Sequence, residues 1–174
     1  MAGKNSTQQK LNHTLKKIVQ ILHQEQIKDW CVIFGTLLGI VREGGCINND
    51  NDIDILINCD FQKLKTILTQ NKLSSGSPFR EGKQNTFLKT QTTEELASID
   101  FYIYEVDKSG KIYIPWTENN ISNCYVDPIH RKFVEMNWND TILHLPNDYE
   151  EKLVSMYGDW QTPSSSRCPL NYDF

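Results

Sequence analysis

Three aspartates stand where their carboxylates could act together on a metal ion. Asp52 and Asp54 are two residues apart in the run DIDILI, which is typical of a buried strand. In a strand this spacing sends both side chains to one face, about 6–7 Å apart, while the isoleucines between them face the core. Asp100 heads a second apolar and aromatic segment, DFYIY, where an unpaired buried charge would be costly. We interpret these aspartates as a shared site for Mg²⁺ or Mn²⁺, and solvated acids at strand ends remain the alternative.

A small-residue turn precedes the acids in the chain and has the features of a phosphate site. Gly35 and Thr36 follow the apolar run CVIF, predicted as a strand over residues 31–34, and lead into a helix predicted over residues 37–42. Such a turn exposes backbone N–H groups at a helix N-terminus, which suits phosphate. Arg42 follows about one and a half turns later with a forked guanidinium group. We therefore predict that Gly35, Thr36 and Arg42 contact a phosphate group.

Other catalytic motifs fit the sequence poorly. An EF-hand loop starting at Asp50 would need Gly and Glu where the chain has Ile55 and Phe61. The histidines show no zinc-ligand spacing to one another or to cysteine. The sequence also has no Walker loop and no serine nucleophile elbow.

Size and charge restrict the class of partner. The chain has 174 residues, a length typical of one domain, and a formal net charge of -4. It has no broad basic field, so we expect no nucleic acid polymer as partner, and a phosphorylated substrate would need a cation to offset the acids. No apolar run is long enough to span a membrane, no signal peptide is evident, and the five cysteines are scattered. These features predict a cytoplasmic protein.

The hydrophobic pattern predicts a mixture of helices and strands in one domain over residues 1–174. A first helix, with Asn5 or Ser6 as its cap, is expected over about residues 8–26, and another begins at Phe61. A catalytic core is expected over about 30–115, with a loop over 73–84. The strands are expected at 52–57, 86–90, 97–106 and 111–115. The C-terminal part, about 146–174, is predicted as a helix capped by Asn147 and ending near Gly158, followed by an extended tail.

Two separated blocks of the sequence resemble the LicD family, which includes fukutin and fukutin-related protein. The run FGTLLGIVREGG (34–45) is close to the family's Gly-Thr-Leu-Leu-Gly-Ala-Val-Arg-x-Gly-Gly pattern. The run DNDIDI (50–55) is similar to its Asp-Asp-Asp-Ile-Asp-Ile stretch. Near the other end, LPNDYEE (145–151) and YGDW (157–160) resemble its closing motifs. The order of the blocks agrees with the family, and the similarity spans most of the chain.

This resemblance implies a fold and an activity. The fold is the α+β nucleotidyltransferase fold, in which a mixed β-sheet packs with helices and the metal site lies at strand ends. The implied activity moves a phospho-alcohol, such as phosphocholine or ribitol phosphate, from a CDP-linked donor to a glycan or other hydroxyl acceptor. Two magnesium ions would be held by the three aspartates, and Asp100 could also take the acceptor's proton.

The resemblance also assigns the candidate ligands of the donor. Gly35, Thr36 and Arg42 match the family's phosphate-binding turn and arginine. Arg131 and Lys132 lie in PIHRKF (128–133), which resembles a family segment that often carries basic residues. We predict that they contact substrate, and a solvated basic turn is an equally open interpretation.

The sequence departs from the family pattern in its loops. Asn48 and Asn49 stand where members commonly have Pro-Trp, Asn51 replaces one acid, and the middle of the chain is short. Two other functions stay open: a nucleotidyltransferase that passes NMP from an NTP to a small molecule or protein, and a catalytically silent binding module of the same fold.

Overall fold

The computed structural model describes residues 7–73, 80–81 and 85–163, and all structural statements below concern this part of the chain. The helices are α1 (Gln8–Gln24), α2 (Phe34–Glu43), α3 (Phe61–Gln70) and α4 (Tyr149–Tyr157). The strands are β1 (Trp30–Val32), β2 (Asp52–Ile57), β3 (Arg80–Glu81), β4 (Phe87–Lys89), β5 (Ser98–Ile103), β6 (Glu105–Val106), β7 (Ile112–Ile114), β8 (Asn119–Ile121), β9 (Val134–Trp138) and β10 (Thr141–Leu145).

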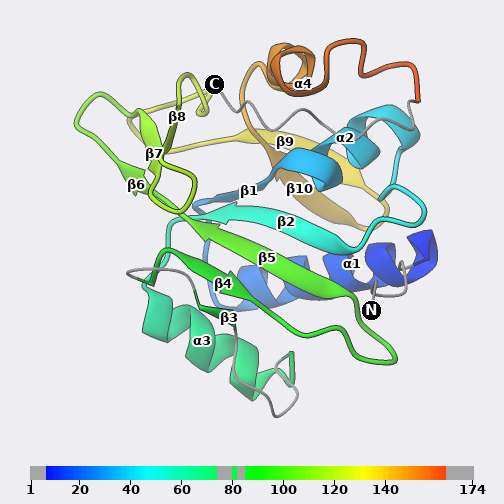
Figure 1. The fold of residues 1–174 in the computed structure, drawn as a ribbon. Helices are drawn as coiled ribbons and strands as arrows, with labels where there is room; N and C mark the ends of the chain where they lie inside the picture. The colour runs from blue at the N-terminus through cyan, green and yellow to red at the C-terminus, as the bar shows by residue number, and fades with distance from the viewer. Residues whose placement is uncertain (1–6, 74–79, 82–84, 164–174) are drawn as a thin grey trace.

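A five-stranded mixed sheet forms the centre of the structure (Figure 1). Its strand order is β1-β2-β5-β4-β3, and β2 and β5 form its parallel pair. In that pair Asp54 and Asp100 are direct Cα partners. On the other side of β5, Lys89 of β4 is the antiparallel partner of Asp100. The register therefore places side chains from three strands on one face.

The alternating pattern of β2 and β5 divides the sheet into an apolar and an acidic face. Ile53, Ile55, Ile99 and Phe101 are all fully buried. Figure 1 shows α1 and α3 on one side of the sheet and α2 and α4 on the other, with α1 packed against β2. The predicted strand over residues 52–57 and the predicted α+β fold are confirmed.

The helices largely follow the prediction, but their starts differ. Thr7 caps α1 by accepting a hydrogen bond from the Lys10 amide, whereas Asn5 and Ser6 lie outside the described residues. The helix α2 begins at Phe34 rather than at residue 37, so Gly35 and Thr36 belong to its first turn. Phe34 adopts a positive φ of 50°, which costs backbone energy in a residue with a Cβ.

The C-terminal helix also differs at its start and agrees at its end. Asp148 occupies the N-cap position of α4 in a left-handed conformation, so the predicted cap at Asn147 is wrong. Gly158 follows the last residue of the helix, as the sequence predicts. The predicted extended tail lies outside the described residues from residue 164 onward.

Several strands depart from the sequence prediction. The segment predicted as one strand over 97–106 splits into β5 and β6, and β6 joins β7 and β8 in a separate three-stranded sheet. Arg80–Glu81 forms β3 inside the predicted loop over 73–84, most of which lies outside the described residues. The hairpin of β9 and β10 was not predicted, and it packs beside β1. None of the described helices is long and apolar enough to cross a membrane.

The helix α2 is held close to the loop that follows it by a glycine. A Cβ atom placed on Gly39 would lie 2.7 Å from the Gly45 carbonyl oxygen and 2.8 Å from the Ile47 amide nitrogen. Both atoms belong to backbone, which cannot turn aside as the end of a side chain can. This contact fixes the path of the chain from α2 to β2.

We therefore expect Gly39→Ala to destabilise the fold, by about 1–3 kcal/mol, because the added methyl group overpacks against backbone. The measurement is the free energy of unfolding in urea. Gly35→Ala is a matched control in the same helix, because its Cβ would meet the end of the Asp50 side chain, which can rotate. Equal stability of the two variants would contradict this account of α2.

Candidate active site

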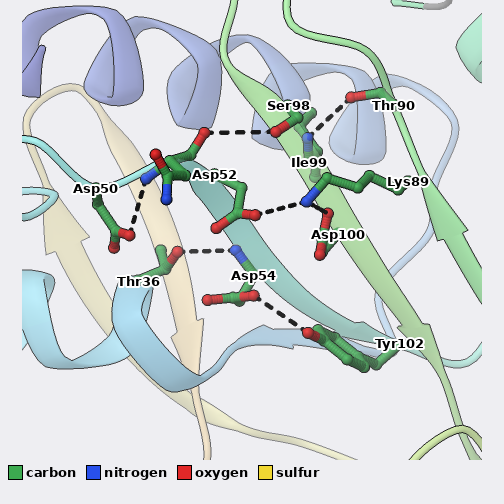
Figure 2. Close-up of polar contacts among 11 residues, drawn as sticks. Thr36, Asp50, Asp52, Asp54, Lys89, Thr90, Ser98, Ile99, Asp100 and Tyr102 are labelled. Atoms are coloured by element: carbon green, nitrogen blue, oxygen red, sulfur yellow. Dashed lines mark hydrogen bonds and ion pairs between the residues drawn. The ribbon is translucent and has the colours of Figure 1, made fainter. Parts of the chain in front are cut away.

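The three aspartates predicted from the sequence lie together on one face of the sheet (Figure 2). Asp52 and Asp54 share a face of β2, and Asp100 lies beside Asp54 on the neighbouring strand. Asp54 and Asp100 are each only 8% exposed. The structure thus brings these three carboxylates to one place.

A fourth carboxylate, Asp50, joins this group from the loop before β2. A Cβ on Gly35 would lie 2.8 Å from Asp50 Oδ2 and 3.6 Å from Asp54 Oδ2. The two carboxylates therefore converge over the first turn of α2, where a side chain at position 35 would crowd Asp50. Asp50 was not predicted as a site residue, although the spacing of Asp50, Asp52 and Asp54 was a usable signal.

Thr36 connects the helix to the acidic strand. Its buried Oγ1 accepts a hydrogen bond from the Asp54 amide at 2.8 Å. The predicted residues Gly35 and Thr36 thus lie beside the acids. In this arrangement Thr36 fixes the position of Asp54 relative to α2.

Lys89 is the cation that the sequence analysis missed. Its Nζ lies 2.6 Å from Asp52 Oδ2 and 2.7 Å from Asp100 Oδ1. The three side chains are partly shielded, with 29%, 22% and 12% of the Lys89, Asp52 and Asp100 side chains exposed. One ammonium group thus joins acids from two different strands, which only the register of the sheet reveals.

The crowded acids alter one another's protonation. Burial, followed by the charges of the neighbouring aspartates, raises the pKa of Asp54 well above its ordinary value, and Lys89 opposes this shift. Burial also raises the pKa of Asp50. Burial lowers the pKa of Lys89, but its hydrogen bonds to Asp100 and Asp52 outweigh this and leave a net increase. Burial and the neighbouring negative charges therefore both oppose ionisation of Asp54.

The donor atoms suit a hard divalent cation, but the side chains are not arranged around one. Within the described residues, no three His, Cys, Asp or Glu side chains are grouped as ligands of a single metal ion. Lys89 instead lies between Asp52 and Asp100. Carboxylate oxygens are the ligands that magnesium and manganese prefer, so the chemistry of the group fits the predicted ion. The predicted magnesium remains a proposal.

Tyr102 and Phe34 border the acids on one side. The Tyr102 hydroxyl lies 3.5 Å from Asp54 Oδ1, and its ring packs edge-on against Phe34 with centroids 5.1 Å apart. Phe87 of β4 lies next to Tyr102 at 5.3 Å. These rings form an apolar boundary that the sequence analysis did not assign to the site.

Arg42 is not placed among the acids. It lies in the last turn of α2, whereas the acids lie at the first. Its guanidinium contacts Glu43 at 2.7 Å and donates to the Trp160 carbonyl oxygen at 3.3 Å. The arrangement therefore connects α2 to the segment after α4 and does not support the predicted phosphate contact.

Arg131 and Lys132 lie at the opposite end of the sheet from the acids. Arg131 pairs with Asp29, next to β1, at 3.3 Å. The length of β2, roughly 15–20 Å, separates that end from Asp52. Arg131 and Lys132 line a cavity of about 590 Å³ with His144 and Phe133. They do not join the candidate site at the acids.

Comparison with known proteins assigns the family. Residues 29–149 match the family described as LicD/FKTN/FKRP, nucleotidyltransferase domain. The chain belongs to this family. The predicted resemblance is thus confirmed, and the match includes all four acids and Lys89.

A solved structure supports the fold of this LicD family member. That solved structure is of another protein, the lincosamide antibiotic adenylyltransferase LnuA bound to lincomycin. The TM-score is 0.59 with 16% sequence identity, over 86% of this chain and 85% of that chain. At this identity the likeness shows the fold alone, which agrees with the predicted nucleotidyltransferase fold. No curated protein sequence matches the chain significantly.

We expect Asp54→Asn to leave the metal-free fold as stable as the parent or more stable near neutral pH. The unfolded chain loses the Asp54 proton near the ordinary pKa, about 3.9, whereas the folded protein keeps it to higher pH. Between the two pKa values the folded state binds more protons, so ionisation of Asp54 lowers stability as pH rises. Asparagine removes that cost. The measurement is the melting temperature with a chelator present, and the gain of Asp54→Asn over the parent should shrink as pH falls towards 4.

Asp140→Asn serves as the control. Its hydrogen bond with Lys16 lowers the pKa of Asp140, so its ionisation favours the folded state, and the substitution should give no gain at neutral pH. A large loss of melting temperature in Asp54→Asn would show that this carboxylate is needed for folding.

Proposed function

We propose that this LicD family member is a metal-dependent phosphotransferase that moves a phospho-alcohol from a CDP-linked donor to a hydroxyl acceptor. Phosphocholine or ribitol phosphate is the type of group transferred, and a glycan is the type of acceptor. The observation that carries the proposal is the grouping of three carboxylates around Asp54, beside the first turn of α2 and within the matched family region.

The proposed donor site lies between α2 and the start of β2. The N-terminal N–H groups of α2 favour negative charge, and Gly35 leaves space for a diphosphate beside them. Lys89 contributes positive charge on the opposite side of Asp52. Asp50 and Asp54 would otherwise repel a phosphate, so the site needs a further cation before it can accept a donor.

The aspartates account for the rest of the proposed chemistry. Asp52, Asp54 and Asp100 would hold magnesium or manganese, with Asp50 beside them. When bound, such an ion would polarise the donor phosphate and offset its charge. Asp100 could also orient the acceptor hydroxyl and take its proton, since it lies beside Asp54 on the same face of the sheet. The rings of Tyr102 and Phe34 would limit water on one side.

A nucleotidyltransferase that passes NMP from an NTP is the second candidate. The similarity of fold to an adenylyltransferase favours it, and the same acids would serve. A silent binding module is disfavoured, because repulsion among retained acids would have no use in it.

The first test is product analysis of the purified protein with magnesium. CDP-choline, CDP-ribitol and the four NTPs are supplied separately, with a panel of glycan and small-molecule hydroxyl acceptors. We expect release of CMP from a CDP-linked donor, and release of pyrophosphate from an NTP would favour the second candidate instead. Activity should be lost in excess chelator and in Asp54→Asn and Asp100→Asn. Undiminished turnover in chelator would contradict the metal requirement.

The second test separates donor binding from folding. We expect Gly35→Val to lose donor affinity by at least tenfold, because its side chain would fill the space beside Asp50 and Asp54. Gly35 does not need a positive φ, so the fold should persist. The measurement is the Kd of the CDP-linked donor by calorimetry in magnesium, with circular dichroism to monitor folding. Arg42→Ala is the control, because Arg42 lies away from the acids: it should lower stability and leave the Kd unchanged.

A further inference from the structure

Lys89 has a position in the site that resembles the position of a metal ion. Its Nζ is within 2.7 Å of carboxylate oxygens from both β2 and β5. A divalent ion that bridges two carboxylates makes the same kind of connection at shorter distances. The ammonium group and such an ion cannot use these two oxygens together, because both are cations and would lie almost in contact.

The sheet fixes Lys89 in this place. Lys89 is the direct cross-strand partner of Asp100, so its backbone cannot shift without a change of register. From β4 the side chain reaches across β5 to Asp52 on β2 (Figure 2). Cross-strand pairs of opposite charge stabilise such an arrangement, and here the partial burial strengthens the attraction.

The remaining acids mark a separate place for a metal ion. Asp50 and Asp54 converge over Gly35, on the side of the site next to α2. The ion pairs of Lys89 are with Asp52 and Asp100, so its ammonium group leaves the charges of Asp50 and Asp54 to another cation. One divalent ion at Asp50 and Asp54, with help from Asp52, would supply the missing charge. Asp100, named above as a further ligand, would then stay paired with Lys89.

We propose that Lys89 replaces the second metal ion of the site, so that the protein binds one divalent ion per chain and not two. The proposal rests on the proposed metal-dependent function. Lys89 is then a positioning residue: it holds Asp52 and Asp100 at a fixed separation. One of its three N–H groups is left for a phosphate oxygen of the donor.

The test is the number of manganese ions bound per chain, measured by calorimetry and by electron paramagnetic resonance on the full-length protein. We expect one ion for the parent and two for Lys89→Met, which removes the competing ammonium group from Asp52 and Asp100. The two ions should also show spin coupling, because metal pairs in such sites are about 3.5–4 Å apart. Lys89→Arg keeps the charge and should bind one ion.

Lys16→Met is the matched control, because Lys16 forms an ion pair of the same length with Asp140 at the surface. It should bind one ion. If Lys89→Met folds poorly, its melting temperature measured at increasing manganese concentrations still tests the proposal. Manganese should raise the melting temperature of Lys89→Met more than that of the parent, because a second ion binds the folded state.

The outcomes separate this proposal from the function on which it rests. Two results would overturn the role of Lys89 and leave the metal-dependent function standing. One is two ions bound by the parent; the other is one ion bound by Lys89→Met, together with a rise in melting temperature on adding manganese equal to that of the parent. Binding of no ion by any of these proteins would overturn both.

Discussion

Repulsion among carboxylates at the start of β2 is the constraint on which the candidate site depends. The parallel pairing of β2 with β5 sets Asp54 beside Asp100, and the hydrogen bond from the Asp54 amide to Thr36 fixes that strand against α2. The acids therefore cannot move apart without loss of main-chain pairing. The fold compensates their charge with Lys89 and with the N-terminus of α2. The sequence features around the site, including the glycine at position 35, follow from this arrangement.

The same sheet serves stability and chemistry through its two faces. The isoleucines of β2 and Ile99 of β5 are fully buried on one face, whereas the acids occupy the other. Each of these two alternating strands thus supplies apolar residues to the core and acids to the opposite face of the sheet. The family match and the similarity of fold to a solved nucleotidyltransferase agree with this division, because the apolar face defines the fold and the polar groups of a site are carried on the other face.

The sequence predicted what depends on local spacing and missed what depends on strand order. DIDILI identified β2 and two site acids, and the helical periodicity identified α1 and α3. The contact of Lys89 with Asp52 could not be predicted, because nothing local indicates that β5 lies between β4 and β2. The contact of Arg42 with Trp160 could not be predicted for a related reason: the sequence places Arg42 on α2, but the position of Trp160 depends on the fold. The hairpin of β9 and β10 had a readable signal, two alternating segments joined by Asn139 and Asp140.

The strand order also sets a sequence of events during folding. Lys89 and Asp100 belong to neighbouring segments of one antiparallel hairpin, so their ion pair can form locally. Pairing of β5 with β2 joins residues much further apart, such as Asp54 and Tyr102, which are 48 positions apart, and closure of that longer loop costs more entropy. Asp100 would then reach β2 with its charge already compensated by Lys89. The lysine would thus help β5 to pair with β2 during folding, in addition to organising the finished site.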